Sequence, residues 1–474
     1  MFKFAVFVLT ANLTRYAANF RRSEHKLNLK IYIAKGLKKM NRGKFYLTVV
    51  IFSLTGQIAW VVENMYFNVF IYNVFSASAA QISLMVSLSS AAATVTTLIV
   101  GAFADKVGKR KIFITLGYIL WGVSVMVFAL LRKDIIEKFV PAARVTAVGV
   151  ALVIVMDCVM TFFGSAANDA CFNAYLTDNT DSTNRGRTEG INSMMPLVAI
   201  LVVFGGFMAF DLTKESRWTA IFSIIGVLVV IIGVLGVFLI KEKPIDASGN
   251  KSYFKNIIYG FRPSVIKSSP ELYLSLACYA VFGIAIQIFM PYLILYYSVS
   301  LGLDNYVVIM APAIICAAAF TFFYGRLYDK LGFGKTIFTP VVIMTTGFLI
   351  LFFFKQTPLV FIGSLLMMCG YLAGTGIFGA VVRDYTPESK TGMFQGLRIF
   401  AQVLIPGLIG PTIGAFVLRN ADKVTNSDGT QSFIPNEKIF IAAAIVCIAL
   451  AILLIPVTLF IKKRKLSAKT EKTI

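Results

Sequence analysis

The chain has 474 residues, of which 58% are hydrophobic and only 14% are charged, whereas soluble domains carry about 25% charged residues. This composition excludes a soluble globular protein, and apolar runs of about 20 residues, long enough to cross a bilayer, recur from residue 45 onward. The net charge of +22 does not indicate nucleic-acid binding, because lysine and arginine gather in short segments between the apolar runs, as orientation in a membrane requires. We therefore predict an all-α membrane protein.

Residues 1–44 precede the first long apolar run and are rich in basic residues. The apolar stretch 4–13 is too short to span a bilayer, and no small-residue cleavage signal follows it. One interpretation is a cytoplasmic N-terminal arm that lies on an anionic membrane surface. The other, which we favour, is that translation starts at Met40 and that residues 1–39 are absent from the mature protein.

About twelve candidate spans follow, as judged by apolar length. A polar segment at 241–269 divides them into two groups of six. We therefore expect an N-terminal six-helix bundle at 45–240, a cytoplasmic linker at 241–269, a C-terminal bundle at 270–461 and a basic cytoplasmic tail at 462–474. The expected spans lie near 45–75, 79–104, 111–131, 145–172, 189–211, 218–240, 270–298, 304–327, 335–354, 358–382, 391–418 and 437–461.

The charges of the short loops predict the orientation. Basic residues accumulate in the loops after the even-numbered spans and in the tail, and cytoplasmic loops are the ones that carry such an excess. The loop at 132–144 is the main exception, since it carries four basic residues on the other side. The pattern places both termini in the cytoplasm, which agrees with an even number of spans.

Two internal repeats indicate that the halves are duplicated. The segment GAFADKVGKRK at 101–111 follows the second span, and a shorter version, GRLYDKLGFGK at 325–335, follows the eighth. The segments 186–190 and 392–396, which follow the fourth and tenth spans, each place a second glycine four residues after a first. Duplicated halves in a membrane protein usually enclose a transport site at their interface.

The first span carries a polar stripe at Gln57, Trp60, Asn64 and Asn68, with Glu63 at its edge on a helical wheel. Ionisable and amide side chains are costly in lipid, so we expect the stripe to line a central cavity. Trp60 is suited to stack on the apolar face of a sugar, although tryptophan in membrane proteins as often serves packing.

Two carboxylates inside the spans are candidates for ion coupling. Glu63 lies well inside the first span, where the alternative role is a helix–helix hydrogen bond to Ser87 or Thr94 of the second. Asp157 lies near the middle of the fourth span with no basic residue within a turn, an environment that suits a group taking up and releasing a proton. The alternative for Asp157 is a neutral, hydrogen-bonded acid with a packing role.

In the second half the candidate substrate residues are Gln287, Tyr371 and Gln402. Arg398 shares a face with Gln402 and needs a counter-charge, for which Asp105, Asp169 and Asp384 are the candidates. We expect Asp105 to act as a latch between the halves, because the start of span eleven offers free N–H groups and the positive end of a helix dipole. The full set of expected cytoplasmic gate residues is Gly101, Asp105, Lys106, Gly108, Arg110, Asp169, Asp329 and Arg398. Within that loop we expect Lys106, Lys109, Arg110 and Lys111 to serve orientation and lipid contact more than gating.

The sequence predicts neither a cofactor nor a metal site. The six cysteines lie in or beside apolar runs and form no CxxC pair, and the single histidine, His25, lies outside the spans and cannot relay protons there. No phosphate-binding loop or hydrolase motif is present, so we expect neither an enzyme nor a transporter driven by ATP in the same chain.

The loop at 101–111 resembles the signature loop of the major facilitator superfamily, which implies two pseudo-symmetric six-helix bundles. The segment 173–180 with Arg185 and Arg187, and the region 384–396, resemble parts of the glycoside–pentoside–hexuronide:cation symporters. The opening at 57–63 resembles the related sucrose/proton symporters. The resemblance implies a sugar or glycoside carried with a cation.

Two departures bear on the ion and the direction of transport. The melibiose-type symporters carry an acidic sodium ligand in span two, whereas residues 79–104 contain no acid, which favours a proton on Glu63 or Asp157. The segment 407–414 resembles the glycine–proline pattern of drug–proton antiporters but lies in span eleven instead of span five. Span four also lacks the arginine that those antiporters carry there.

The sequence thus predicts a monomeric, multi-pass cell-membrane transporter that moves a small polar solute, a sugar or glycoside in the first place, by alternating access with proton or other cation coupling. Its expected partners are the solute, the co-transported ion and the lipid bilayer, and not nucleic acid. An exporter of drugs or metabolites is the alternative, and a membrane sensor or enzyme a remote one. Solute, direction and ion stay open, because fold resemblance does not supply them.

Overall fold

The chain divides into two compact units, Met1–Thr48 and Val49–Ile474. In the first, the described residues begin the first helix, where Thr48 Oγ1 donates to the Lys44 carbonyl at 2.8 Å. Residues 1–41, with Met40 and His25, and the greater part of the expected linker lie outside the described residues. The computed structural model describes residues 42–180, 184–241, 259–303, 305–386, 391–426 and 428–470.

Within these ranges, twelve helical spans are long and apolar enough to cross a bilayer, which confirms the expected number. The largest difference is in the fourth span, which ends at Asn179 instead of near residue 172. In its polar end, the side chains of Thr177 and Asn179 donate hydrogen bonds to the backbone carbonyls four residues earlier, those of Asn173 and Tyr175. The spans are Gly43–Phe75, Ala79–Val107, Arg110–Leu130, Ala142–Asn179, Arg187–Phe207, Glu215–Leu239, Pro270–Ser300, Val307–Leu331, Phe333–Phe353, Thr357–Tyr385, Gly396–Leu418 and Lys438–Arg464.

The N-terminal half interrupts its α-helices with π-helical turns in spans one and four. Such turns insert an extra residue per turn and occur frequently at functional sites. The elements are α2 (Arg42–Val61), a π turn (Val62–Tyr66), α3 (Phe67–Phe75), α4 (Ala79–Val107), α5 (Arg110–Val127), a 3₁₀ turn (Phe128–Leu130), α6 (Lys133–Ile136), α7 (Ala142–Gly164), a π turn (Ser165–Phe172), α8 (Asn173–Asn179), α9 (Arg185–Phe207) and α10 (Glu215–Leu239).

The C-terminal half has the corresponding six spans and one small β-hairpin. Its elements are a 3₁₀ turn (Tyr259–Phe261), α12 (Pro263–Ser268), α13 (Pro270–Phe289), a 3₁₀ turn (Met290–Tyr292), α14 (Leu293–Leu295), a π turn (Tyr296–Ser300), α15 (Val307–Leu331), α16 (Phe333–Thr336), α17 (Phe338–Phe353), α18 (Thr357–Tyr385), α19 (Thr391–Ile399), a π turn (Phe400–Leu404), α20 (Ile405–Leu418), β1 (Lys423–Thr425), β2 (Gln431–Phe433) and α21 (Lys438–Thr470). The expected linker thus includes α12, and the expected tail continues α21 as helix as far as Thr470.

The repeated glycines of the two similar loops have a conformational cause. Gly108 and Gly332 end α4 and α15 with φ of +70° and +75°, a left-handed conformation that costs side-chain-bearing residues energy. Each glycine lies two residues after the lysine of an Asp-Lys pair. The repeat therefore marks equivalent helix ends in two equivalent halves.

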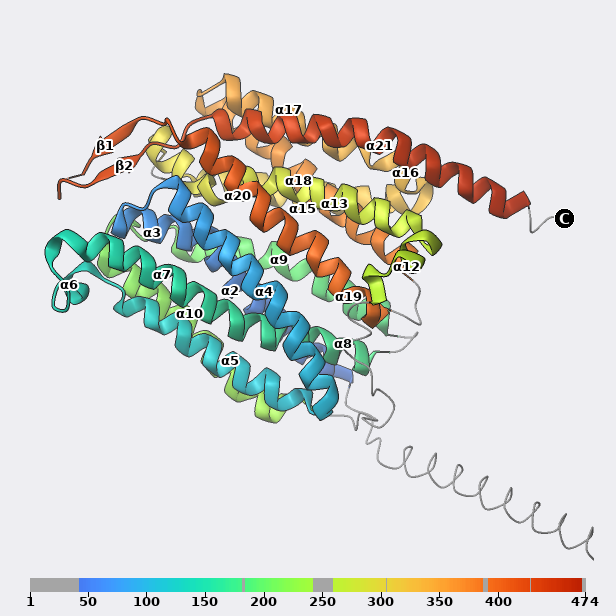
Figure 1. Ribbon diagram of the computed structural model, residues 1–474, viewed down its shortest axis with the longest axis horizontal. Coiled ribbons are helices and arrows are strands. Elements are labelled where there is room, and N and C mark those ends of the chain that lie inside the picture. Colours follow the sequence, from blue (N-terminus) through green and yellow to red (C-terminus); the bar gives the residue numbers. More distant parts are fainter. Residues whose placement is uncertain are drawn as a thin grey trace, which may run out of the picture. The chain divides into compact units, whose positions relative to one another are not determined.

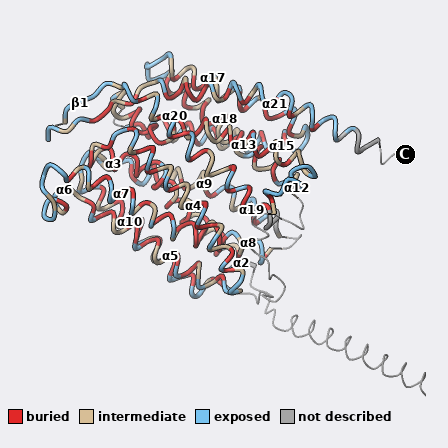
Figure 2. The backbone as a smooth tube through the Cα atoms, viewed as in Figure 1, coloured by how far each residue is buried: buried red, intermediate tan, exposed pale blue. Residues whose placement is uncertain are grey.

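The two halves form six-helix bundles that meet along α4 and α20, which lie side by side (Figure 1). Gly407 allows the close approach, since a Cβ there would lie 2.0 Å from Ser90 Oγ, and Ser87 Oγ donates to the Gly407 carbonyl at 3.1 Å. Buried residues lie where helices face one another, and exposed ones along their outer faces (Figure 2).

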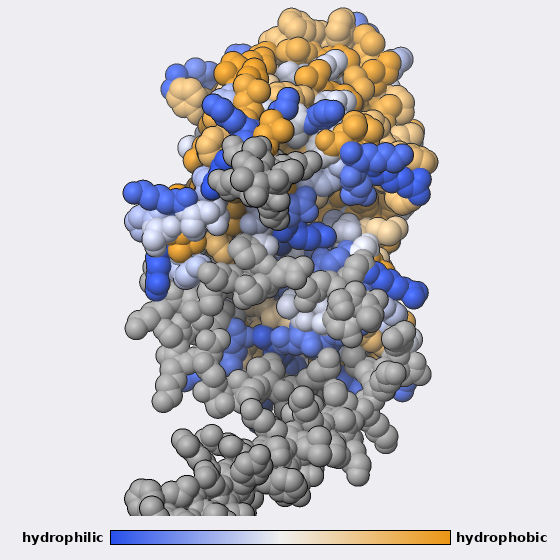
Figure 3. Space-filling view, turned by 90° about the vertical axis from the view of Figure 1, so that its right-hand side faces the viewer, coloured by the Kyte–Doolittle hydropathy of each residue, from blue (hydrophilic) through white to orange (hydrophobic). Residues whose placement is uncertain are grey.

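We name the two ends of the bundles by their elements. The hairpin end carries β1, β2 and α6, and the linker end carries α12, α8 and α19 (Figure 1). Seen from the linker end, hydrophilic residues gather on the face and hydrophobic ones on its flanks (Figure 3). This distribution fits helices that cross a bilayer from one end to the other.

Candidate functional site

Glu63 is buried where spans one, two and four meet. It lies in the π turn Val62–Tyr66 and is only 7% exposed. Its Oε1 accepts hydrogen bonds from Ser89 Oγ at 2.6 Å and from Thr161 Oγ1 at 2.7 Å, and the two hydroxyl oxygens lie 2.8 Å apart. One carboxylate oxygen thus joins three helices.

Asp157 belongs to the same cluster. It lies one turn before Thr161 on α7, is 2% exposed, and interacts with Ser89 and, electrostatically, with Glu63. Glu63 Oε2 and Asp157 Oδ1 are buried without a hydrogen-bond partner, and no lysine or arginine among the described residues lies within 4.0 Å of either carboxyl group. The structure therefore brings together the two acids that the sequence singled out.

The expected helix–helix partners of Glu63 were in the right span but at the wrong positions. Ser87 faces span eleven, where it bonds the Gly407 carbonyl, and Thr94 bonds the Ser90 carbonyl of its own helix. Ser89, which the sequence reasoning missed, takes their place. Which of the hydroxyls of span two meets Glu63 depends on the rotation of α4 against span one, and this is a tertiary feature.

A second polar cluster surrounds Asp169, in the π turn of span four. Asp169 accepts from Ser165 Oγ at 3.0 Å and from Asn168 Nδ2 at 3.1 Å, and it also interacts with the Trp60 side chain. The Trp60 ring lies 4.9 Å from that of Trp121, centroid to centroid. Trp60 therefore has a packing contact on one side and a polar contact with span four.

The polar stripe of span one does not form a single face. Asn64 is exposed and Gln57 is half-buried, as expected for residues near a cavity, but Asn68 is completely buried. Its Nδ2 donates to the Asn64 carbonyl at 2.7 Å. The expectation that Asn68 lines a cavity was wrong, because the π turn Val62–Tyr66, which contains Asn64, changes the helical phase before Asn68.

In the second half, Arg398, Gln402, Tyr371 and Gln287 come from three spans. Arg398 Nε donates to Gln402 Oε1 at 3.2 Å. Tyr279 on α13, which the sequence reasoning missed, interacts with both Arg398 and Tyr371. The only sequence feature that could have indicated Tyr279 is its hydroxyl group inside an otherwise apolar run. Gln287 is half-buried, and its Cβ would lie 2.4 Å from a Cβ placed on Gly410.

The loop at 101–111 is held within the N-terminal half. Arg110 is 8% exposed, and its guanidinium pairs with Asp105 at 2.7 Å and with Asp178 at the end of span four. The expectation that Arg110 serves orientation and lipid contact was therefore wrong. Lys106 on the same loop is exposed, and Gly101 is half-buried.

The second loop differs from the first at the position of Arg110. Five residues after the aspartate stands Gly334, and Asp329 is exposed. Tyr328 instead bonds Asp384 at the end of span ten, with 2.6 Å between the oxygens. The second and fourth spans of each half are thus connected at the linker end. In the first half the connection is a pair of salt bridges through Arg110 at the start of span three. In the second half it is a direct hydrogen bond between Tyr328 and Asp384.

None of the expected counter-charges pairs with Arg398 in this state. Asp105 lies against Arg110, Asp169 against Ser165 and Asn168, and Asp384 against Tyr328. Among the described residues no carboxylate lies within 4.0 Å of Arg398. At the start of span eleven, where the expected partner groups of Asp105 lie, the side chains of residues 391–393 and 395 are outside what the structure describes.

The two halves are joined at the hairpin end. Tyr72 OH donates to the Phe433 carbonyl at 2.6 Å, Ser76 Oγ and Thr430 Oγ1 lie 2.8 Å apart, and Lys133 Nζ lies 2.5 Å from Asp428 Oδ2. Further contacts join Tyr292 to Ala79 and Tyr306 to Tyr66. These bonds close the hairpin end between the halves.

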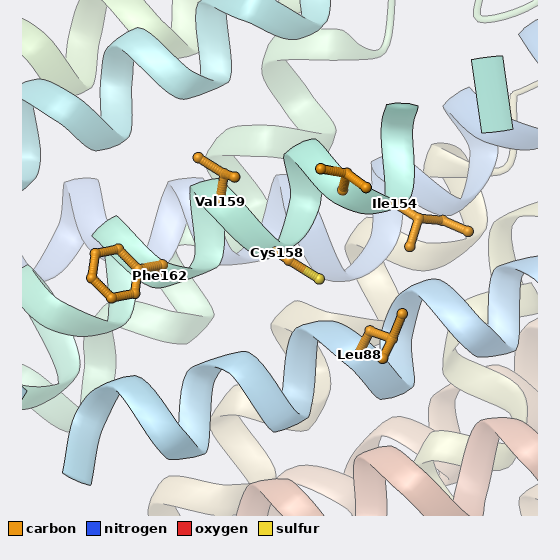
Figure 4. A pocket seen from close by; sticks show the side chains of 6 residues that line it. Leu88, Ile154, Cys158, Val159 and Phe162 are labelled. Atoms are coloured by element: carbon orange, nitrogen blue, oxygen red, sulfur yellow. The ribbon is translucent and has the colours of Figure 1, made fainter. Parts of the chain in front are cut away.

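An apolar pocket of about 330 Å³ lies on the outside of the N-terminal half, between α4 and α7 (Figure 4). It is not a site for a polar solute, because its lining is hydrocarbon apart from one thiol. Val155 in this lining is 58% exposed, which fits contact with lipid chains. The lining residues are Leu88, Ile154, Val155, Cys158, Val159 and Phe162.

Comparison with known proteins agrees with this architecture. A family model described as Major Facilitator Superfamily matches residues 45–411 and, in a second alignment, 309–473. No match was found in a sequence search of curated proteins.

Solved structures share the fold at low identity. The chain is similar to the nucleoside transporter NupG (14% identity, TM-score 0.63, 87% of this chain and 98% of that one) and to a bacterial homolog of the human lysosomal transporter Spinster in an inward-facing, unoccupied conformation (17%, 0.62, 89% and 96%). It is also similar to the xylose transporter XylE from E. coli in a partially occluded, inward-open conformation (14%, 0.61, 86% and 98%). Because the family model covers most of the chain, this protein belongs to the major facilitator superfamily and is a secondary transporter of small molecules, not an enzyme.

Proposed function

We propose that the protein moves a sugar or glycoside across the cell membrane by alternating access, coupled to a proton or another cation. The observation that carries the coupling proposal is the buried cluster of Glu63 and Asp157 with Ser89 and Thr161. Each carboxyl group keeps one oxygen without a partner.

Two buried carboxylates without a basic partner are costly if both are charged, because burial and mutual repulsion act together. A bound proton removes the charge, and a bound cation compensates it. The hydroxyls of Ser89 and Thr161 stabilise the charged form of Glu63, so the site supports both occupancy and release. We favour a proton, since this geometry supplies two acids from spans one and four and none from span two.

The solute site is proposed between the halves. Trp60, Asn64 and Gln57 would contribute from the N-terminal bundle, and Gln287, Tyr371 and Gln402 from the C-terminal one. Support for a sugar comes from the resemblance of 173–187 and 384–396 to sugar symporters, and solved structures with this fold include a D-xylose-proton symporter (15% identity, TM-score 0.64, 86% of this chain and 97% of that one). At this identity the likeness extends to the fold only.

The contacts at the hairpin end support an inward-facing state. Basic loops at the linker end favour placing that end in the cytoplasm, and both termini with it. The hairpin end would then be the closed extracytoplasmic side, and the solute would be released toward the linker end. Gate residues at that end would include Asp105, Asp169, Asp329 and Arg398.

Export is the second candidate, suggested by the glycine–proline pattern at 407–414. That pattern has a packing explanation here, since a Cβ on Gly410 or Gly414 would lie 2.9 Å or less from a backbone carbonyl of span seven. The pattern therefore does not by itself favour export.

The test is uptake by proteoliposomes that contain the purified protein. Labelled hexoses, pentoses, glycosides and nucleosides are offered with an inward proton gradient, with a sodium gradient, or with neither. We expect accumulation of a sugar under the proton gradient only. Sugar uptake driven by the sodium gradient alone would identify sodium, and not a proton, as the coupling ion. Uptake of nucleosides without uptake of any sugar would show that the proposed solute class is wrong.

A further inference from the structure

We propose that three buried aromatic residues, Tyr66, Phe204 and Tyr306, form a gate on the hairpin side of the proposed solute site, here called the hairpin-side gate. The π turn Val62–Tyr66 carries one of them together with Glu63, and it transmits the protonation state of Glu63 to the gate. The inference rests on the proposed function, since it assigns a consequence to proton binding at the coupling site. Its starting observation is that a single turn of span one contacts two separate sets of helices.

The first attachment of this turn is the carboxyl group of Glu63. Its Oε1 accepts hydrogen bonds from Ser89 of span two and Thr161 of span four, both in the N-terminal half. Hydrogen bonds to a charged acceptor are roughly twice as strong as those to a neutral one. A charged Glu63 therefore holds the turn against these two helices, and a proton on Glu63 weakens the attachment. The other titratable groups that face Glu63 are Asp157, Cys158 and Asp169, all on span four.

The second attachment is the side chain of Tyr66, three residues later in the same turn. Tyr306, which directly precedes α15 in the C-terminal half, donates from its hydroxyl to the Tyr66 hydroxyl at 3.4 Å. The ring of Phe204 on α9 lies 6.1 Å from that of Tyr66 and 6.0 Å from that of Tyr306, centroid to centroid. All three side chains are buried, so they exclude solvent where the halves meet.

The place of these rings along the pathway follows from the order of the spans. Trp60 and Asn64, which are proposed to bind the solute, precede Tyr66 in span one, and that span continues to Phe75 at the hairpin end. The connection between spans seven and eight, which includes Tyr306, lies at the same end, because Ser300 Oγ donates to the carbonyl of Pro435 just after β2. A solute that enters from the hairpin end therefore has to pass the hairpin-side gate.

A π turn can rearrange in a way that an α-helical turn cannot. The Phe67 N–H bonds the Val62 carbonyl five residues earlier, so the turn holds one residue more than an α-helical turn. Moving this extra residue along the helix rotates the residues that it passes by about 100°, the angle that one residue occupies. Glu63 and Tyr66 both lie in the segment that such a movement reorients.

Two amide side chains keep the backbone of the turn hydrogen-bonded during this movement. Asn64 Nδ2 donates to the Trp60 carbonyl at 2.8 Å, and Asn68 Nδ2 donates to the Asn64 carbonyl at 2.7 Å. A carbonyl with a side-chain donor keeps a partner when its backbone bond is exchanged. The buried Asn68, which lines no cavity, thus acquires a role in the turn itself.

The direction of the effect follows from the two attachments. Opening of the hairpin-side gate separates Tyr66 from Tyr306, and the turn then moves with the N-terminal half. A charged Glu63 favours this separation because it fixes the turn to spans two and four. A protonated Glu63 lets the turn stay with Tyr306, so proton binding favours the closed gate. A symporter requires this order, since an ion taken up from one side must close that side.

The experiment is a double-mutant cycle on the purified full-length protein. Spin labels at Ala209 and Asn305, exposed residues near Phe207 and Tyr306 in the chain, report the open and closed populations of the gate in a background without the native cysteines. Glu63→Gln represents the protonated residue. We expect it to raise the ratio of closed to open gate about threefold to tenfold, because it replaces a charged acceptor by a neutral one.

The second member of the cycle is Tyr66. In Tyr66→Leu the turn has lost its ring contacts and its bond to Tyr306, so Glu63→Gln should no longer change the ratio. Tyr66→Phe removes the hydroxyl alone and should reduce the effect of Glu63→Gln, which keeps the test valid if the leucine variant does not fold.

Tyr292→Phe is the matched control. It removes another buried hydroxyl bond between the halves, the one to the Ala79 carbonyl at 3.0 Å, but it lies outside the π turn. The effect of Glu63→Gln should therefore persist in full in Tyr292→Phe, since effects at independent sites add. The melting temperature of each variant checks folding.

Three outcomes overturn the inference. They are a ratio that Glu63→Gln leaves unchanged in the otherwise wild-type protein, an undiminished effect of Glu63→Gln in Tyr66→Leu (or in Tyr66→Phe if the leucine variant does not fold), and an equal reduction of that effect by Tyr292→Phe. If Glu63→Gln nevertheless abolishes proton-driven accumulation of the sugar, the proposed function stands without the inference. If accumulation survives as well, both fail.

Discussion

Thr161 donates a hydrogen bond to Glu63 across 2.7 Å, although the two residues are 98 positions apart in the chain and belong to spans four and one. Ser89 of span two donates to the same oxygen. These bonds connect the proposed coupling group in span one to spans two and four. A change of protonation at Glu63 would thus act directly on the packing of three spans.

Removing the hydroxyl groups of Thr161 and Ser89, which donate to Glu63, should weaken the coupling of transport to the proton more than it lowers the stability of the protein. In Thr161→Val, Glu63 Oε1 keeps only Ser89, and a charged group that loses one hydrogen bond is destabilised by about 1.5–3 kcal/mol. We expect gradient-driven uptake to fall about tenfold, and to fall further in Thr161→Val with Ser89→Ala. Thr346→Val is the control, since that exposed hydroxyl bonds only its own helix. Wild-type uptake in the double variant would contradict this role.

The ion pair at the hairpin end should influence which side is open. The hydrogen bond from Lys133 to Asp428, with a second from Thr430, holds the pKa of Asp428 below its usual range. Because the folded-state pKa is lowered, the stabilisation is fully present above about pH 4, the ordinary value. It is lost as the pH falls below that. Near neutral pH the contact should therefore be constant.

Asp428→Asn should loosen this contact at neutral pH. Spin labels at Phe139 and Val424, both exposed, would report a longer distance between the two loops. Asp134→Asn is the matched control, because Asp134 pairs with Arg132 within one loop. An unchanged distance distribution in Asp428→Asn would show that the pair does not hold the hairpin end closed.

Arg110 should be needed for stability at the linker end. Arg110→Gln leaves Asp105 and Asp178 facing each other without the cation between them, and removing one partner of a buried ion pair costs about 3 kcal/mol. Because both aspartates are about one-third exposed, we expect somewhat less. The melting temperature in detergent should fall clearly, whereas Lys106→Gln should leave it unchanged.

Asp105→Asn tests the latch between the halves: wild-type transport in correctly inserted protein would exclude it.

Gly410 should tolerate no side chain. A Cβ there would lie 2.4 Å from Gln287 Cβ and 2.9 Å from the Ile284 carbonyl oxygen, so α20 and α13 would have to separate. Overpacking of this kind costs about 1–3 kcal/mol. Gly410→Ala should thus lower the melting temperature, and Gly206→Ala, where a Cβ meets nothing within 4 Å, should not. Equal melting temperatures would contradict the packing explanation of the 407–414 pattern.

The sequence was sufficient for the features that depend on local physics. Apolar length predicted the twelve spans, and the glycine repeats predicted equivalent helix ends, now seen as the left-handed Gly108 and Gly332. Glu63 and Asp157 were identified because an acid inside an apolar run is costly wherever it lies. Their shared cluster is a tertiary contact, which no local sequence pattern predicts.

The failures have two physical causes. The π turn in span one breaks the regular period on which the wheel depends, so Asn68 was placed on the wrong face. Ser89 was missed because the face of span two that meets Glu63 is set by tertiary packing. Arg110 pairs with Asp178, 68 positions away, and no local pattern reveals such a partner. Tyr279 was missed because a tyrosine in an apolar run is usually a packing residue, and the sequence does not show which side chains surround it in space.

The most direct test of the central claim is proton-driven accumulation of the transported sugar in proteoliposomes containing wild type, Glu63→Gln, Asp157→Asn or the exposed loop variant Glu137→Gln. The account predicts that both neutralised variants lose accumulation against the gradient but still exchange external for internal sugar, whereas Glu137→Gln behaves as wild type. Accumulation at the wild-type rate and extent in both Glu63→Gln and Asp157→Asn would contradict it.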